Sequence, residues 1–229
     1  QWFSVSTPRA AQVACDGGVT VLASGRHERK LRRGQLAANA FAIRLRDVRG
    51  DDWGERLEMI GRRGVPNYFG PQRFGGDVGD NLVRAREWLP HRRRRSVSRF
   101  KQGLYLSVLR GFLFNEVLGR RVANHSWCNA LPGDVAEERG PTGPLWGRGR
   151  SSTGDEAGEV EAAALAPHAE LCEGLEYAGV RQQRRALALR PEGLEWEADA
   201  GDLQVRFRLP PGSYATSLLM EAFALESPA

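Results

Sequence analysis

Twelve residues, 64–75, constrain the fold of this chain more than any other stretch. They read Gly-Val-Pro-Asn-Tyr-Phe-Gly-Pro-Gln-Arg-Phe-Gly and combine three aromatic residues with two prolines, three glycines and one arginine. Proline fixes φ and lacks a backbone donor, whereas glycine permits positive φ, so the composition predicts a shaped loop rather than a helix or a long strand. The aromatic rings either pack inward or offer flat faces to a ligand. By physics alone, the favoured interpretation is an ordered crossing between two domains.

The charge of the chain favours a polyanionic partner. Lys and Arg number 33 against 28 Asp and Glu, which gives a net charge of +5 and an isoelectric point near 9.5. All the basic residues except Lys30 and Lys101 are arginines, whose planar guanidinium groups bind phosphates and stack on bases. The excess fits a nucleic-acid partner, although an arginine preference can also follow from genomic base composition.

Length and composition are those of a soluble protein with one large or two modest domains. Of the 229 residues, 41% are hydrophobic and 27% are charged, and no apolar run reaches the length of a membrane span. Cys15, Cys128 and Cys172 are widely spaced and form no Cys-x-x-Cys motif, which argues for free thiols in a reducing cytosol and against a zinc site. We therefore expect a cytoplasmic monomer with no membrane association and no bound metal.

Hydrophobic periodicity predicts both strands and helices. In the clearest strand, which opens at Asn39, Phe41, Ile43 and Leu45 alternate with residues of the opposite face. Further strands are expected at 1–5, 19–22, 194–197 and 203–209. Helices are expected at 51–63, 81–89, 98–122, 163–175 and 218–225. Asp51 and Ser213 are the candidate N-caps, and Pro90 is expected to stop the second helix.

Three segments look irregular or strongly charged. Residues 132–161 are rich in Gly, Pro and Ser, so we expect a long and partly mobile surface excursion whose carboxylates are solvated. Residues 25–34 are either a solvated basic turn or a phosphate-binding segment. Residues 91–95, His-Arg-Arg-Arg-Arg, are either an exposed linker or a contact to a nucleic-acid backbone.

Five strings resemble, in this order, the motifs of the TruD family of tRNA pseudouridine synthases. They are Arg-His-x-x-x-Leu-Arg-x-Gly at 26–34, Asn-x-Phe at 39–41, the segment 64–75, Arg-x-x-Leu-Phe-Asn at 110–115, and Leu-Pro-x-Gly-Ser-Tyr-Ala-Thr-Ser at 209–217. The resemblance implies an α+β fold, with a mixed, mostly antiparallel pseudouridine synthase sheet and helices, interrupted by an inserted, mainly helical α/β TRUD domain. The incomplete catalytic core would comprise 1–63 and 190–229, and the inserted domain 64–189.

The resemblance also implies roles for residues whose chemistry alone would suggest packing. Asn39 would bond the target nucleotide, Phe41 would support it, and Tyr214, where the family commonly has Phe, would lie against the base. Without the resemblance, Asn39 is a turn residue, Tyr214 packs at a helix start, and Asn115 bonds a backbone group. The residues expected to bind RNA are Arg26, His27, Lys30, Arg32 and Arg73.

The implied reaction places a chemical demand on the site. The uridine must leave its stack, so flat faces and hydrogen-bond donors must hold it. The glycosidic C–N bond then breaks with the help of a nucleophilic Asp, and the uracil turns and rejoins through carbon, without metal or organic cofactor. By resemblance, the substrate is tRNA and the target uridine 13, near the D stem.

No catalytic residue is expected within this chain. In the family, the nucleophilic Asp lies in a Gly-Leu-Lys-Asp string, and no Asp of these 229 residues has that context. The resemblance implies that this string lies upstream of Gln1. The apolar pattern starts at once with Trp2 and Phe3, so we interpret the sequence as the later part of a longer protein and expect it to be inactive alone. The alternatives are a non-catalytic RNA-binding protein that keeps the synthase scaffold and an unrelated basic structural protein.

Overall fold

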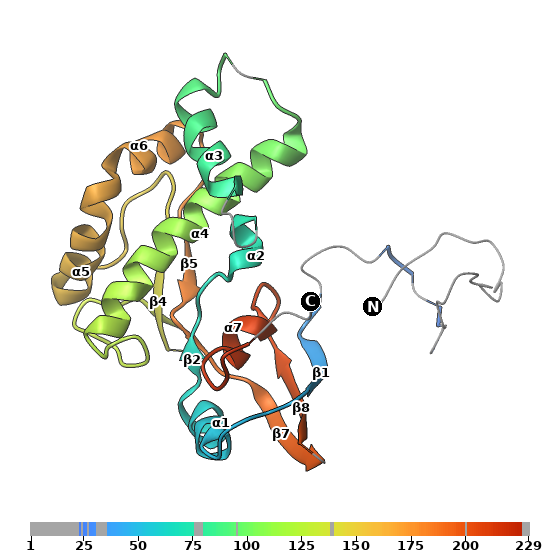
Figure 1. The fold of residues 1–229 in the computed structure, drawn as a ribbon. Helices are drawn as coiled ribbons and strands as arrows, with labels where there is room; N and C mark the ends of the chain where they lie inside the picture. The colour runs from blue at the N-terminus through green and yellow to red at the C-terminus, as the bar shows by residue number, and fades with distance from the viewer. Residues whose placement is uncertain are drawn as a thin grey trace.

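The computed structural model describes residues 36–75, 80–94, 96–137, 140–199 and 201–225, together with residues 23, 25, 26 and 28–30. Helices and antiparallel sheets alternate along it, which confirms the predicted α+β class (Figure 1). Helices α3 to α6 lie together in the upper part of Figure 1, and the largest continuous ladder lies below them with α1 and α7. The strands predicted at 1–5 and 19–22 lie outside the described residues.

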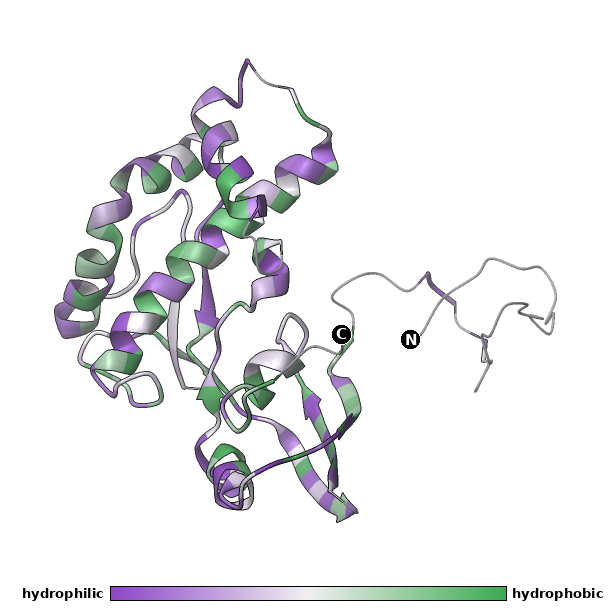
Figure 2. Ribbon diagram, in the orientation of Figure 1, coloured by the Kyte–Doolittle hydropathy of each residue, from purple (hydrophilic) through white to green (hydrophobic). Residues whose placement is uncertain are grey.

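The lower sheet contains three antiparallel strands in the order β1-β8-β7. Their bounds are β1 Asn39–Leu45, β7 Glu192–Asp199 and β8 Asp202–Leu209. The β1–β8 register sets Asn39 opposite Leu209 and Phe41 opposite Phe207, so strands from the two ends of the sequence form one ladder. Exposure alternates along β1 and β8 as the period-two pattern predicts, and Figure 2 shows hydrophilic and hydrophobic bands along β7 and β8.

Two helices, α1 (Trp53–Arg63) and α7 (Ala215–Leu219), contribute apolar residues to the core of this sheet. Leu57 of α1 and Leu218 of α7 are fully buried in the same cluster as Val205. Burial of apolar surface, at about 25 cal/mol per Å², is the main stabilising term for such a core. The apolar spacing predicted for α1 therefore serves to cover the sheet.

The upper part is built around the long helix α4, Arg99–Ala123, as the apolar stripe predicts. Ser98 caps it, because its hydroxyl accepts a hydrogen bond from the Lys101 N–H at 3.3 Å. The other elements of this part are α3 Asp80–His91, β3 Ala136–Glu137, β4 Gly140–Leu145, α5 Asp155–Leu165, the 3₁₀ turn Ala166–His168, α6 Ala169–Tyr177 and β5 Gln183–Ala186. β3, β4 and β5 form an antiparallel sheet whose strands follow that order.

The chain crosses between the two parts on a pair of short antiparallel strands, β2 (Val65–Pro66) and β6 (Ala188–Leu189). Gly64 precedes β2 with a φ of 77°, and a Cβ there would lie 2.5 Å from the Leu189 carbonyl oxygen. Only glycine fits this close backbone approach. The beginning of the segment 64–75 is thus an ordered crossing, followed by the short helix α2 (Pro71–Phe74).

Some of the predicted element ends and caps were wrong. Pro90 lies inside α3, one residue before its end at His91. The helix predicted at 163–175 is two helices separated by the 3₁₀ turn. The last helix begins at Ala215 rather than 218 and follows Tyr214, not Ser213, at its N-cap position. The residue before α1 is Asp52, and no side-chain cap bond is present there.

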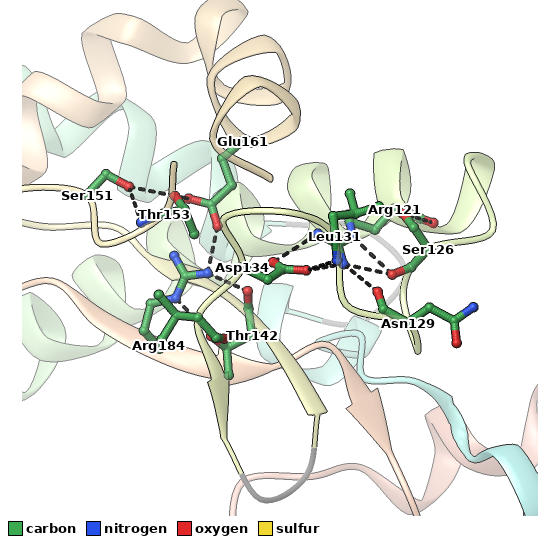
Figure 3. Close-up of polar contacts among 11 residues, drawn as sticks. Arg121, Ser126, Asn129, Leu131, Asp134, Thr142, Ser151, Thr153, Glu161 and Arg184 are labelled. Carbon is green, nitrogen blue, oxygen red and sulfur yellow. Dashed lines mark hydrogen bonds and ion pairs between the residues drawn. The ribbon is translucent and has the colours of Figure 1, made fainter. Parts of the chain in front are cut away.

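The prediction for residues 132–161 was also wrong, because this segment contains β3, β4 and most of α5. Glu161, expected in solvent, is buried and accepts a hydrogen bond from Arg184 Nη2 at 2.7 Å (Figure 3). The Asp134 side chain is buried against Arg121, whose Nη2 lies 2.7 Å from Asp134 Oδ2. These two carboxylates are therefore buried, each beside an arginine, instead of being exposed to solvent.

Candidate functional site

The candidate site begins where the segment 64–75 reaches α4. Asn115 holds Phe69 with a two-point bond: its Oδ1 accepts from the Phe69 N–H at 2.9 Å, and its Nδ2 donates to the Phe69 carbonyl at 3.0 Å. Gly111, one turn earlier, allows the Phe69 ring to lie against the helix, since a Cβ there would sit 3.2 Å from that ring. The prediction that Asn115 bonds a backbone group is confirmed.

Phe69 is the centre of a cluster of rings and guanidinium groups, called here the Phe69 cluster. Its members are Phe69, Arg73, Phe114, Arg185 and Tyr214. The Phe69 ring is 5.6 Å from the Phe114 ring and 6.3 Å from the Tyr214 ring, both in edge-on geometry. The guanidinium carbons of Arg185 and Arg73 lie 4.1 Å and 5.2 Å from the Phe69 centroid. These distances allow cation–π attraction from both arginines.

Arg185 joins the crossing segment to the turn before α7. It donates to Asn67 Oδ1 at 2.6 Å and to the Gly212 carbonyl at 3.0 Å. Asn67 is itself buried, and its Nδ2 donates to the Ala186 carbonyl at 2.8 Å. Burial lowers the pKa of Arg185 to about 10, with a smaller lowering from Arg73 and an opposing effect of Tyr214. Arg185 stays protonated at neutral pH and brings positive charge among the rings.

The structure brings Tyr214 and Arg73 together at the Phe69 ring. Both are half-buried, and both contact the Phe69 ring from different segments of the chain. Asn39 is half-buried at the end of β1, opposite Leu209, after which β8 leads into the turn that carries Tyr214. The register therefore sets Asn39 at the end of the sheet from which the chain leaves β8 towards Tyr214.

Phe41 occupies a different environment from Tyr214. Its ring stacks on Phe207 at 5.4 Å with an interplanar angle of 27°, and it packs against the core of the lower sheet. Asn39 and Phe41 share one face of β1, because residues two apart point the same way. Phe41 therefore lies beside Asn39 on that face, two residues further along β1.

The basic string at 26–34 is only partly visible. Arg26 and Lys30 are exposed, and no hydrogen bond or ion pair joins them to another described residue. His27 and Arg32 lie outside the described residues, so their expected RNA contacts stay predictions. Of the second basic run, 91–95, the residues His91, Arg93 and Arg94 are exposed.

The expected position of the nucleophile, upstream of Gln1, is not tested by the structure. Gln1 and the residues that follow it, up to 22, lie outside the described residues. The Phe69 cluster, as described, contains cations and rings but no Asp. The expectation that this chain carries no catalytic residue therefore stays a prediction.

Sequence reasoning missed the role of Arg185 in the Phe69 cluster. The sequence assigned no role to Arg184 or Arg185. In the structure the two side chains point in opposite directions from β5, Arg184 towards Glu161 and Arg185 towards Phe69. The sequence did contain a signal for this, because neighbouring residues of a strand point to opposite faces, so two consecutive arginines cannot share one environment.

Titratable groups near the cluster are shifted mainly by burial. The pKa of Tyr68 is raised by burial and, to a smaller extent, by Glu221 and Glu116. Burial also raises the pKa of the Glu221 carboxyl. Among the described residues, no carboxylate pairs with Arg73 or Arg185. The cluster therefore combines aromatic faces with uncompensated positive charge, which suits a base and the phosphates beside it.

The part of the chain that the structure describes offers no candidate for a metal site or a membrane span. No group of three or more His, Cys, Asp or Glu side chains is placed to hold a metal ion there. No helix there is long and apolar enough to cross a bilayer.

Comparison with known proteins gives one consistent answer. The family model described as tRNA pseudouridine synthase D (TruD) matches residues 1–86 and 136–222. The chain is 40% identical to the tRNA pseudouridine synthase D of Xanthomonas axonopodis pv. citri, over 96% of this chain and 72% of the relative. It is 39% identical to that of Hydrogenovibrio crunogenus, over 99% of this chain and 73% of the relative.

A solved structure shows the same fold. The crystal structure of a putative tRNA pseudouridine synthase D from Methanosarcina mazei superposes with a TM-score of 0.61, at 20% identity, over 86% of this chain and 71% of that one.

Proposed function

The chain belongs to the tRNA pseudouridine synthase D family, and from this premise we propose that it takes part in the isomerisation of a uridine in tRNA to pseudouridine. The observation that carries the proposal is the Phe69 cluster. It brings together two motif segments of the chain, 64–75 and 209–217, and Asn39 of a third motif pairs with Leu209, the first residue of the second segment. Motifs far apart in sequence that converge in space support a shared site.

The proposed roles follow from the chemistry of each side chain. Tyr214 offers its ring to the flipped-out uracil, because stacking on an aromatic face holds a base removed from its stack. Asn39 carries both a donor and an acceptor, which match the polar edge of the nucleotide. Phe41 supports Asn39 from the core, and Arg73 contacts an RNA phosphate. Arg26, His27, Lys30 and Arg32 extend the phosphate contacts.

The nucleophile is proposed to come from outside these 229 residues. The reaction requires a carboxylate that assists cleavage of the glycosidic bond, after which the uracil rotates and rejoins through carbon. No Asp here stands in a Gly-Leu-Lys-Asp string. We propose that residues 1–63 and 190–229 form part of the catalytic core and that 64–189 form an inserted domain. The protein would act as a cytoplasmic monomer on uridine 13, without a cofactor.

Activity assays test the proposal directly. Tritium release from tRNA labelled at C5 of uridine would be measured for this chain and for a form that carries the upstream codons of its reading frame. We expect release only from the longer form, and its loss when the Asp of the Gly-Leu-Lys-Asp string is changed to Ala. Release by the 229-residue chain alone would refute the assignment of the nucleophile.

Variants of Tyr214 test the base-stacking role. Tyr214→Ala should weaken tRNA binding by about 1–3 kcal/mol, whereas Tyr214→Phe should preserve it, because stacking needs the ring and not the hydroxyl. Tyr177→Ala is the control, since Tyr177 is 75% exposed on α6, away from the Phe69 cluster. Failure of the longer form to release tritium, with binding intact and sensitive to Tyr214→Ala, would favour a non-catalytic RNA-binding protein.

A further inference from the structure

We infer that a basic pocket in the upper part of the molecule binds phosphates of the RNA backbone. The pocket, called here the Arg148 pocket, has a volume of about 690 Å³ and lies between the loop after β4 and the strand β5. Its wall includes Arg148, Arg150, Ser152, Arg181, Gln182 and Arg184. The inference rests on the proposed function only in naming RNA as the source of the phosphate.

The backbone of the pocket is fixed by pairing between its two segments. The Arg148 N–H donates to the Val180 carbonyl at 2.6 Å, and the Gln182 N–H donates to the Arg148 carbonyl at 3.1 Å. A Cβ at Gly147 would lie 2.4 Å from the Val180 carbonyl oxygen, so this approach requires glycine. The arginines of the two segments are therefore carried by a defined scaffold.

Arg184 supplies a buried charged group in the wall. Its side chain is 10% exposed; Nη2 donates to Glu161 at 2.7 Å and Nε donates to Thr142 Oγ1 at 3.0 Å (Figure 3). Nη1 of the same guanidinium is buried and has no hydrogen-bond partner among the described residues. Both polar atoms of the Gln182 amide are in the same state. Buried polar groups are normally satisfied, and two of these atoms, Arg184 Nη1 and Gln182 Nε2, are donors that the oxygens of a phosphate can satisfy.

The rest of the charge in the wall is uncompensated. Arg148, Arg150 and Arg181 are exposed, and within the described part of the chain none of them has an ion-pair partner. Several guanidinium groups around one concave surface concentrate positive potential there. Arginine forks bind phosphate oxygens with paired N–H donors, and such contacts supply most of the affinity of proteins for RNA backbones.

The pocket is distinct from the Phe69 cluster. Arg184 and Arg185 are neighbours on β5, but Arg184 lines the pocket and Arg185 stacks on Phe69. One short strand therefore carries a side chain of each site. A bound RNA that reached both would be held at two points by the same rigid element.

Salt-dependent binding tests this inference. The 229-residue chain and its Arg148→Gln/Arg181→Gln variant would be titrated with a fluorescent tRNA transcript between about 50 and 200 mM salt. The variant should bind about tenfold more weakly at low salt, and the slope of log Kd against log salt should fall by about two, because each substituted arginine removes one phosphate interaction. The matched control is Arg84→Gln, which removes an exposed charge from α3.

Equal Kd and equal slope for the variant and the wild-type chain would overturn the inference. Pyrophosphate tests whether the pocket prefers a free anion to RNA. The inference would also be overturned if pyrophosphate stabilised the wild-type chain but not the variant, while both bound tRNA with the same Kd. In the longer, active form the double change should raise KM and leave kcat unaltered, whereas an unchanged KM would count against it. If the double change weakens tRNA binding and the longer form releases no tritium, the proposed reaction is refuted but the phosphate-binding role of the pocket is supported.

Discussion

Asn115 and Phe69 are joined through both backbone groups of Phe69, which the Asn115 amide binds at 2.9 Å and 3.0 Å. The Asn115 amide thus satisfies the two backbone groups of Phe69 that a neighbouring strand would bind in a sheet. These two hydrogen bonds hold Phe69 against α4, and the guanidinium groups of Arg73 and Arg185 lie over its ring. An amide on a helix of the upper part therefore positions the ring at the centre of the candidate site.

Replacing Asn115 with Ala should destabilise the chain by about 2–4 kcal/mol, because the buried N–H and C=O of Phe69 would both lose their partner. Urea unfolding at neutral pH measures the free energy of unfolding directly. Asn129→Ala is the control: Asn129 is exposed, its side chain points away in Figure 3, and the change should stay within about 0.5 kcal/mol. Similar effects of the two changes would mean that the Asn115 amide does not hold Phe69.

The sequence predicted those elements whose own residues carry a hydrophobic periodicity. The alternation of Phe41, Ile43 and Leu45 identified β1, because a strand with one buried face carries that signal by itself. Strand β4 reads Gly-Pro-Thr-Gly-Pro-Leu, which is turn chemistry, yet it pairs with β5, far along the chain. Gly143 allows that packing, since a Cβ there would lie 2.8 Å from Leu187. Tertiary pairing overrode local propensity.

Only those residues of the candidate site that lie in the family motifs could be predicted from the sequence. Tyr214 and Arg73 were identified by resemblance, and they do meet at Phe69. Arg185 was not identified, because a charged residue in a polar run is expected to be exposed to solvent. Its burial depends on aromatic rings and hydrogen-bond acceptors that lie elsewhere in the sequence. Its acceptors, Asn67 and Gly212, come from two other segments, and only the folded chain brings them together.

Two glycines of α4 provide a matched pair for testing how closely Phe69 contacts the helix. Gly103 has nothing within 4 Å of its Cβ position, so Gly103→Ala should stabilise the chain by about 0.5–1 kcal/mol through helix propensity. Gly111→Ala gains the same propensity but places a methyl group 3.2 Å from the Phe69 ring. We expect Gly111→Ala to be less stable than Gly103→Ala and to weaken tRNA binding. Equal stabilisation by both changes would contradict the observed packing.

Cys172 should be protected from alkylation in the native chain. Burial, with a smaller contribution from Glu176, raises the pKa of its thiol to about 11, so about one thiol in a thousand is ionised at pH 8. In a Cys15→Ser/Cys128→Ser variant, iodoacetamide should label native Cys172 at least about 100-fold more slowly than in concentrated urea, where the pKa returns to about 8.5. Comparable rates in the two states would exclude a buried thiol.

The same raised pKa has a consequence for stability at alkaline pH. The native state keeps the Cys172 proton between the unfolded pKa, about 8.5, and the native value, so it binds more protons than the unfolded state in that window. The contribution of Cys172 is therefore fully present below about pH 8.5 and is lost as pH rises towards 11. Cys172→Ala should show a shallower decline of unfolding free energy over this range than the chain that retains Cys172.

The buried pair of Arg121 and Asp134 allows a test of coupling between two charges. Both side chains are 2% exposed and meet through two contacts, at 2.7 Å and 3.1 Å. Asp134→Asn should destabilise the chain by about 3–5 kcal/mol, because it leaves the guanidinium buried without its counter-charge. Arg121→Met strands the carboxylate in the same way. The Arg121→Met/Asp134→Asn double variant should fall short of the summed single effects by about 1–3 kcal/mol, since each single change leaves a charge that the double removes.

The exposed pair Arg62 and Glu58 on α1 is the matched control for this cycle. Its side chains are 75% and 55% exposed, although the contact distance, 2.7 Å, equals the shorter contact of the buried pair. Solvent screens such a pair, so removing either partner should change the unfolding free energy by less than about 0.5 kcal/mol. Burial, rather than contact distance, would then account for the difference between the two pairs. Additive effects at Arg121 and Asp134 would instead show that the turn after α4 relaxes and readmits water around whichever charge remains.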